Sequence, residues 1–222
     1  MRAPYSVLAL SLALALRAVP ALAQDAEATP ADRIVLPAPA RTGGGDLLEA
    51  LDRRRSSRQF ADVDLDLQDL STLLWATAGQ NREDGRFTYP TYGNQQDMLL
   101  FVAIRSGLYR YDPAAHALEP VAGGDLRGKT GMDRMPWAGA AAVNLAFVQD
   151  LRKWREDRPD VDPRNYGFLH AGLMMQSAGL YAASRGWSCV VRAFFNPALP
   201  EALGLPGHQW VVVTQTIGPA GE

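Results

Sequence analysis

The sequence predicts an α+β domain in which a mainly antiparallel sheet is flanked by helices. Three observations support this. Two runs with helical spacing come early in the chain, short apolar runs bounded by turn residues follow, and a long apolar helix precedes the last strands. The 222 residues are enough for one domain with a sizeable core. Apolar residues make up 47% of the chain and charged residues 21%, as in ordinary globular proteins.

The first 23 residues have the layout of a secretory signal peptide. Arg2 supplies a positive charge, residues 7–16 are apolar, and Ala21-Leu22-Ala23 fits a cleavage site. Arg17 ends the apolar stretch too early for a membrane anchor. We therefore expect a periplasmic or secreted protein with no membrane attachment after cleavage. The alternative is a poorly ordered apolar N-terminus.

Residues 24–45 are rich in Ala, Pro and Gly, which indicates a linker or N-terminal arm before a domain at 46–222. The formal net charge is −2 and no stretch is basic enough to suggest nucleic-acid binding. Cys189 is the single cysteine, so no intrachain disulfide can form. Its apolar neighbours favour a buried, inert thiol.

The first half of the domain begins with two predicted helices. Asp46 can cap a helix from Leu47 to Arg54, and a second helix over 65–78 ends at Gly79. A polar and aromatic loop follows at 81–96. Strands are predicted at 98–104, 108–111 and 118–121, the first two joined by the Ser106-Gly107 turn.

The second half alternates strands and helices. A buried strand is predicted at 140–148, and a helix at 163–185 has no strict polar face, so it should lie in the core or at a subunit contact. Gly186 ends this helix. A strand at 189–195, a short helix at 197–203 and a final strand at 209–217 complete the order.

Two polar clusters are candidates for a binding site. Residues 53–58 hold four arginines and two serines, which can bind a dianionic phosphate through bidentate hydrogen bonds. The alternative is a solvated basic helix end. Residues 86–96 combine amide, hydroxyl and aromatic groups that suit the edge and the face of a heteroaromatic ring. The alternative here is a long surface loop.

Together the clusters make the sequence resemble the nitroreductase family of FMN enzymes and its dehydrogenase-like branch. Arg54, Arg55, Ser56 and Arg58 match the pattern Arg-Arg-Ser-x-Arg, and residues 90–96 are similar to the family loop Pro-Ser-Ser-x-Asn-x-Gln. Looser similarities are a hairpin, a core helix and a strand, at Gly107-Leu108-Tyr109-x-Tyr111-Asp112, Ala171-Gly172-x-x-x-Gln176 and Gly186-Trp187-x-x-Val190-Val191-Arg192. The resemblance extends from Leu47 to Gly218.

The resemblance implies a homodimer whose FMN sites are built from both subunits, with the helix at 163–185 serving the dimer contact. The phosphate and ribityl end would lie on Arg54, Arg55, Ser56 and Arg58. The isoalloxazine edge would meet Thr91, Tyr92 and Asn94. The backbone of Val191, Arg192 and Ala193 would pass the other side of the ring.

The resemblance also implies an oxidoreductase that passes hydride through the flavin between a donor and a small-molecule substrate or acceptor. NADH or NADPH is the family's usual donor. No catalytic acid or base is required, because the flavin carries the chemistry. The Arg192 side chain is our candidate for stabilising the reduced ring near its N1/O2 edge.

The sequence departs from the family pattern in three places. Residues 218–222 lack the basic residue that relatives carry after the last strand, Ser177 replaces an Asn, and Tyr92 is bulkier than the usual residue. A second hypothesis is therefore a non-catalytic relative that keeps the fold and binds flavin or another ligand.

Two other kinds of site are weaker hypotheses. The segment from Gly123 to Thr130 matches a P-loop pattern literally, but Gly131 and Pro136 interrupt the helix that such a loop needs. His116, His170 and His208 lack metal-ligand spacing, so no metal site is expected.

Overall fold

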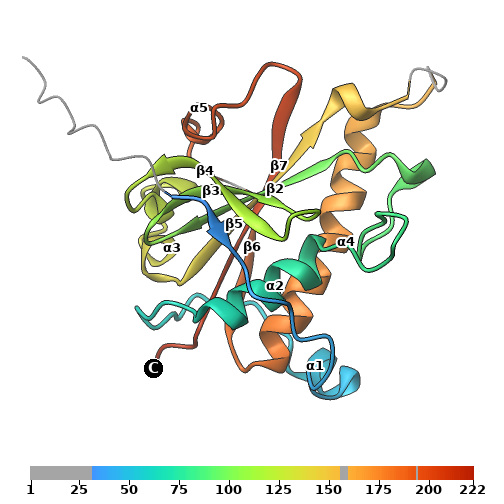
Figure 1. Ribbon diagram of the computed structural model, residues 1–222. Helices are drawn as coiled ribbons and strands as arrows, with labels where there is room; N and C mark the ends of the chain where they lie inside the picture. Colours follow the sequence, from blue (N-terminus) through green and yellow to red (C-terminus); the bar gives the residue numbers. More distant parts are fainter. Residues whose placement is uncertain (1–31, 156–159, 194) are drawn as a thin grey trace, which may run out of the picture.

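The computed structural model describes residues 32–155, 160–193 and 195–222. The predicted signal peptide lies outside these residues. Seven strands form one sheet in the order β1-β4-β3-β2-β5-β7-β6, and every neighbouring pair is antiparallel (Figure 1). The strands are β1 (Ile34–Val35), β2 (Met98–Ile104), β3 (Gly107–Asp112), β4 (Ala117–Gly123), β5 (Val143–Asp150), β6 (Ser188–Arg192) and β7 (Gln209–Gly218). The predicted α+β class is confirmed.

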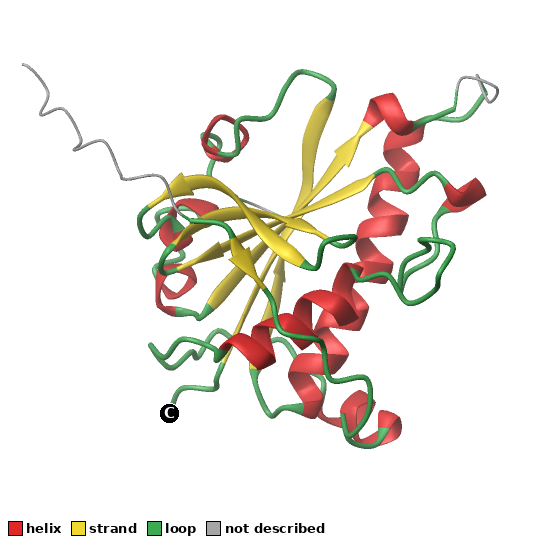
Figure 2. Cartoon of the chain, in the orientation of Figure 1, coloured by secondary structure: helices red, strands yellow, loops and turns green. Residues whose placement is uncertain are grey.

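Helices lie on both faces of this sheet (Figure 2). The α-helices are α1 (Leu47–Arg53), α2 (Leu67–Ala78), α3 (Trp137–Ala140), α4 (Pro163–Ser184) and α5 (Leu199–Ala202). Three short 3-10 turns are η1 (Tyr92–Asn94), η2 (Arg127–Thr130) and η3 (Leu151–Lys153). In the described part of the chain, no helix combines the length and apolar character needed to span a bilayer.

Alternation along the strands separates two cores. Leu100 and Val102 of β2 point to the side of α2 and α4, where they join the larger core. Phe101 and Ala103 point to the other side and pack with α5 in a smaller core. Both faces of the central strands are therefore buried, which explains why they read as continuous apolar runs.

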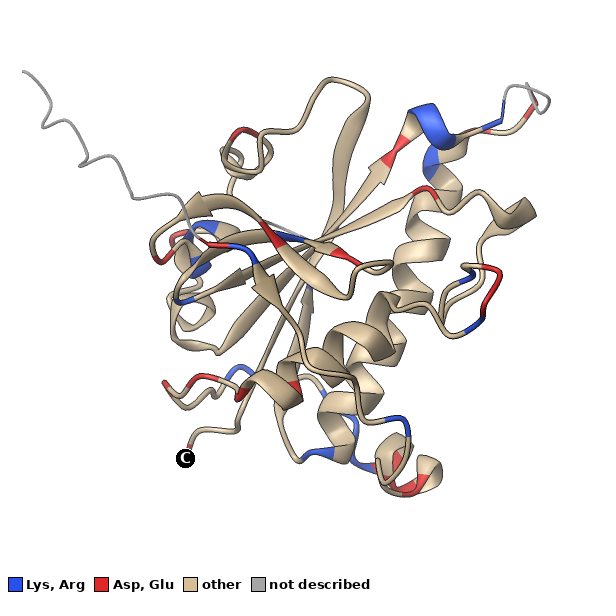
Figure 3. Cartoon of the chain, viewed as in Figure 1, with Lys and Arg blue, Asp and Glu red and all other residues tan. Residues whose placement is uncertain are grey.

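Helix α4 carries almost no charge after its first turn, as its tan colour in Figure 3 shows. Ala171, Met174, Ala178 and Ala182 are buried along one line and face the sheet. The remaining small and polar residues of α4 do not form a polar stripe. The predicted helix at 163–185 is confirmed, with Arg185 as its C-cap.

Several predicted boundaries were wrong by a few residues. The second helix begins at Leu67 because Asp66 accepts a hydrogen bond from the Asp69 N–H and caps it. The strand predicted at 140–148 begins at Val143, since residues 137–140 form α3. The strand predicted at 189–195 is β6, which ends at Arg192; Phe194 lies outside the described residues.

The N-terminal arm holds a strand that the sequence did not predict. Ile34 and Val35 pair with Leu118 and Ala117 at the edge of the sheet. Leu36 is buried in the larger core. The arm from residue 32 onward therefore packs on the domain.

The P-loop hypothesis is contradicted by the structure. The four-residue turn η2 takes the place of the helix that a P-loop requires. The Thr130 hydroxyl donates to the Arg127 carbonyl at 2.8 Å and accepts from Arg192 at 3.1 Å, so it is not presented to a ligand.

Candidate functional site

The arginine segment is held across the end of the sheet by backbone hydrogen bonds. The Ser57 N–H donates to the Cys189 carbonyl on β6 at 2.9 Å. The Gly221 N–H donates to the Gln59 carbonyl at 3.1 Å, and the Ala61 N–H donates to the Pro219 carbonyl at 3.0 Å. A Cβ at Gly221 would approach the Phe60 backbone to 2.9 Å, so the two chains pass too closely for a larger residue. This pairing fixes residues 57–61 between β6 and the C-terminal segment.

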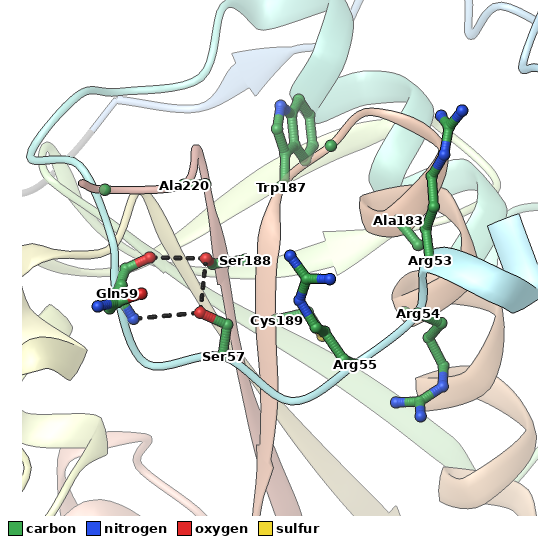
Figure 4. Close-up of a pocket in the computed structure, with 13 residues that line it drawn as sticks. Arg53, Arg54, Arg55, Ser57, Gln59, Ala183, Trp187, Ser188, Cys189 and Ala220 are labelled. Carbon is green, nitrogen blue, oxygen red and sulfur yellow. Dashed lines mark hydrogen bonds between the residues drawn. The ribbon is translucent and has the colours of Figure 1, made fainter.

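A first cavity of about 260 Å³ opens beside this segment (Figure 4). Its basic wall is formed by Arg53, Arg54 and Arg55. In Figure 4 the Arg53 and Arg54 side chains extend in different directions, and the Arg55 side chain projects over β6 next to Cys189. The opposite wall comes from α4, Trp187 and the C-terminal segment: Gly179, Ala183, Gly186, Trp187, Ser188, Cys189, Ala220 and Gly221.

A second cavity of about 190 Å³ adjoins the first, and both are lined by Arg54, Arg55, Gly179 and Cys189. Its other walls come from the motif serine, α4, β6 and β7: Ser56, Gly172, Met175, Gln176, Val190, Val191 and Gln215. Each cavity alone is below the ~300 Å³ lower end of small-molecule pockets, and the two together reach that range.

Few acidic side chains neutralise the arginines of this wall. Among the described residues, no acidic side chain forms an ion pair with Arg54 or Arg55, whereas Arg53 pairs with Glu49 at 3.1 Å on the exposed surface. Exposed pairs of this kind contribute little stability. Two or three guanidiniums are therefore available for an anion such as a phosphate.

The hydroxyls near the arginines have different roles. Ser188 Oγ donates to the Gln59 carbonyl at 2.6 Å and lies 3.0 Å from Ser57 Oγ. The Gln59 N–H donates to Ser57 Oγ at 3.3 Å (Figure 4). Ser57 and Ser188 therefore stabilise the chain path, while the exposed Ser56 lines the second cavity.

Cys189 lies where the two cavities meet, with 9% of its surface exposed. Burial raises the pKa of the thiol, although a hydrogen bond from Gln215 and the charge of Arg54 oppose that shift. The predicted buried thiol is confirmed. Its position on the cavity wall was not predicted.

Six predicted site residues line neither cavity: Arg58, Thr91, Tyr92, Asn94, Arg192 and Ala193. The Arg58 guanidinium lies over the Trp137 ring, 6.0 Å from its centroid. Arg192 points to the opposite face of the sheet, where its guanidinium donates to the Thr130 carbonyl at 2.7 Å and to Asn144 Oδ1 at 2.9 Å. It is 3% exposed, and burial lowers its pKa to about 10. The geometry therefore gives no support to contact between the Arg192 side chain and a flavin ring edge.

The predicted ring-binding loop is separated from the arginines by α4. The Tyr92 ring lies against Trp154 and Tyr166, at centroid distances of 5.9 and 4.4 Å. The Tyr92 N–H donates to His170 Nε2 at 2.8 Å. His170 and Gly179 are nine residues apart, which places them on opposite faces of α4 and about 14 Å apart along its axis. Within one chain, Thr91, Tyr92 and Asn94 therefore do not meet Arg54 and Arg55.

A buried hydrogen-bond network holds this loop. His170 Nδ1 lies 2.7 Å from Asp97 Oδ1, and both residues are 0% exposed. Since the Tyr92 backbone N–H can only donate, His170 Nε2 accepts, and the imidazole proton is on Nδ1. Gln149 donates to the second oxygen of Asp97 at 2.7 Å and accepts from Trp210 Nε1 at 2.8 Å. The network connects the loop to α4 and to two central strands.

The structure thus combines an α+β fold with two adjoining cavities whose shared wall carries arginines, a charge that suits an anion. The sequence model described as "Nitroreductase family" matches residues 51–219. This chain belongs to the nitroreductase family, and membership implies an oxidoreductase.

Individual relatives agree with this family. A protein of Methanocaldococcus jannaschii, provisionally named a nitroreductase, is 26% identical over 166 residues, which cover 71% of this chain and 83% of the relative. A crystal structure of a provisionally named nitroreductase from Ralstonia eutropha JMP134 is 36% identical, with a TM-score of 0.79, and the match covers 90% of this chain and 97% of that one. The NADPH:FMN oxidoreductase of Vibrio harveyi is 19% identical with a TM-score of 0.58 over 80% of this chain and 70% of that one, and so shares the fold.

Besides the position of Cys189, sequence reasoning missed the Gln215 amide, the Trp187 ring and the C-terminal segment at Ala220 and Gly221. Gln215 could have been noticed as an uncharged polar residue in an otherwise Val- and Thr-rich strand. The C-terminal segment could not be recognised from its side chains, because Ala220 and Gly221 are small and carry no functional group.

Replacing His170 should test the loop network. His170→Ala leaves the Tyr92 N–H and Asp97 Oδ1 without their partner in a buried region, so the free energy of unfolding should fall by at least about 2 kcal/mol. Urea unfolding measures this, and hydrogen exchange at the Tyr92 amide should accelerate. His208→Ala is the control, because its ring nitrogen is 3.8 Å from Asp150 and forms no comparable bond. Equal stability and equal Tyr92 protection in both variants would contradict the assigned role.

Proposed function

We propose that the protein is an FMN-dependent oxidoreductase that transfers hydride between a donor and a small organic acceptor or substrate. The observation that carries the proposal is the pair of adjoining cavities walled by Arg54 and Arg55 in a nitroreductase fold. When bound, FMN supplies the site with an acceptor and donor of hydride. The chain's own residues need to bind and orient it.

The residues present fit the two chemical ends of FMN. Arg53, Arg54 and Arg55 provide positive charge at the first cavity, where they would hold the phosphate. Ala220 and Gly221 on the opposite wall carry no basic side chain, and Arg53 supplies a third cation to the cavity. Ser56, Val191 and Gln215 line the second cavity, which would take the ribityl chain or part of the ring. Arg58 and Arg192 are not included in this proposal.

A homodimer would resolve the separation between the loop and the arginines. Phe168 and Leu169 of α4 are 57% and 52% exposed, and Leu47, Leu48 and Leu51 of α1 are also exposed. A second copy that covers these apolar side chains would bring its own Thr91, Tyr92 and Asn94 to this site. We therefore infer that each flavin site uses the arginines of one subunit and the loop of its partner.

The electron donor depends on where the protein acts. NADH and NADPH are the family's usual donors, but their pools are cytosolic. If the signal peptide functions, a dehydrogenase acting directly on an organic substrate, or a flavin reduced by a protein partner, agrees better with a periplasmic or secreted location.

A second candidate function is a non-catalytic relative that binds a flavin or another ligand. The absence of a basic residue at 218–222 favours it. Reduction of bound FMN by a hydride donor, followed by reoxidation by an added acceptor, would distinguish the enzyme from a binding protein.

FMN affinity should depend on the arginine wall. Arg54→Ala and Arg55→Ala should each weaken FMN binding by about ten- to a hundredfold, because a charge-assisted hydrogen bond contributes ~1.5–3 kcal/mol. Riboflavin lacks the phosphate, so its affinity should change little. Titration of the apoprotein measures both. Arg110→Ala, an exposed arginine on β3, is the matched control. Equal losses for FMN and riboflavin would refute the phosphate assignment.

Cys189 should report occupancy of the cavities. It is the single cysteine, so iodoacetamide labelling followed by mass spectrometry reads one position. FMN at about ten times its dissociation constant should slow labelling about tenfold, because about a tenth of the molecules remain unoccupied. Since burial raises the thiol pKa, labelling of the apoprotein should still increase above pH 9. An FMN-independent rate would place the flavin elsewhere. Cys189→Ser controls for labelling at other residues.

Export should be visible at the N-terminus. Expression of the full chain in a bacterium with a periplasm should give a periplasmic protein that begins at Gln24, because Ala21-Leu22-Ala23 fits the cleavage site. Intact-mass measurement of the two cell fractions tests this. A cytoplasmic product that retains its N-terminal residues would contradict export, and changing Ala23 to a large residue should block cleavage.

A further inference from the structure

Gln215 is a buried amide in the wall of the second cavity. It is 1% exposed and lies on β7, directly across from Val191 on the edge strand β6. Paired residues of antiparallel strands point to the same face, so Gln215 faces α4 together with Val191. On its other side its strand neighbour is Leu145, a core residue with no polar group to offer.

The orientation of the Gln215 amide is fixed by its donors. Nε2 donates to the Met175 carbonyl of α4 at 3.1 Å and lies 3.1 Å from Cys189 Sγ. Rotating the amide by a half turn would place Oε1 against the carbonyl oxygen, where two acceptors repel. The Nε2 atom therefore makes both contacts of the amide. Oε1 has no hydrogen-bond partner in the described structure.

A buried amide oxygen without a donor is unfavourable, and such groups in folded proteins usually meet a partner. The second cavity is also lined by side chains that carry donors, those of Arg54, Arg55, Ser56 and Gln176, but none of them forms a hydrogen bond with Gln215 Oε1. We propose that Gln215 Oε1 is a recognition group that accepts a hydrogen bond from an N–H or O–H group of the bound ligand. This inference rests on the proposed flavin site.

With Gln215 in this role, the two ends of the site would select different chemical groups. Arg54 and Arg55 favour an anion at one end, whereas a lone carbonyl oxygen repels anionic oxygens and selects a neutral donor. FMN offers such donors in two places, the hydroxyls of the ribityl chain and the imide N–H of the ring. Gln215 would thus orient the ligand after the arginines have bound its phosphate.

Removing the acceptor tests the proposal. Gln215→Met keeps a chain of similar length without a hydrogen-bonding group. FMN and riboflavin should both bind the apoprotein about three- to tenfold more weakly, because the lost bond does not involve the phosphate. Thr214→Val is the matched control: Thr214 is equally buried on the same strand but faces the opposite side, so affinity should be unchanged. Equal affinities for both flavins in Gln215→Met and the wild type would overturn the proposal.

Flavin analogues test it in the wild-type protein, independently of whether the variant folds. If the imide N–H is the donor, 3-methyl-FMN should bind about three- to tenfold more weakly than FMN. If a ribityl hydroxyl is the donor, an analogue lacking one of these hydroxyls should show the loss instead. The affected analogue should bind the wild type and Gln215→Met equally well. Analogues that all match FMN would overturn the proposal.

Flavin binding by the wild type and by Gln215→Met also distinguishes failure of the Gln215 role from failure of the proposed flavin site. A wild-type protein that binds neither FMN nor riboflavin would refute the flavin site itself and this inference with it. A wild-type protein that binds both flavins, with an undiminished affinity in Gln215→Met, would refute only the role of Gln215.

Discussion

The packing of α4 against the sheet is the constraint on which the rest of the structure depends. Ala171, Met174, Ala178 and Ala182 bring the helix close to the strands, because their side chains are short or flexible. The same approach leaves space on the adjacent face, where Gly172 and Gly179 line a cavity instead of filling it. The opposite face receives the loop through His170. One helix therefore forms the core, the wall of the cavity and the support of the loop.

The second constraint is the pairing of residues 57–61 with β6 and the C-terminal segment. Arginines on a flexible tail would lose much of their binding energy as ordering entropy. Here the backbone hydrogen bonds fix the path of the chain from Ser57 onward, next to Arg54 and Arg55, before any ligand binds. A preorganised wall of this kind would allow a segment of mostly exposed side chains to hold the phosphate in the proposed site.

The sequence predicted the fold class, the order of the main elements and the family. The continuous apolar runs at 98–104 and along α4 follow directly from burial on both sides, so these two elements could be predicted from the sequence. The arm strand β1 was not, because two residues in an Ala- and Pro-rich segment give no periodic signal. The placement of Arg192 failed for a related reason: alternation predicts two faces for a strand, but it does not tell which face holds the cavity. Likewise, the sequence gives the order of the arginines and the loop along the chain. It does not show that α4 lies between them in the folded protein.

The buried polar groups of this protein suggest how to separate structural from ligand-binding residues. His170 and Asp97 have their hydrogen bonds satisfied within the chain, so their network is complete without a ligand. Arg192 donates to Thr130 and Asn144 with its terminal nitrogens; its buried Nε has no partner in the described structure, but Arg192 lines neither of the two cavities. Gln215 differs from both, because it has a buried acceptor without a partner and also lines the second cavity. Burial alone does not distinguish these residues. The combination of burial, an unused hydrogen-bonding atom and an adjoining cavity does, because only there can a ligand supply what the chain lacks.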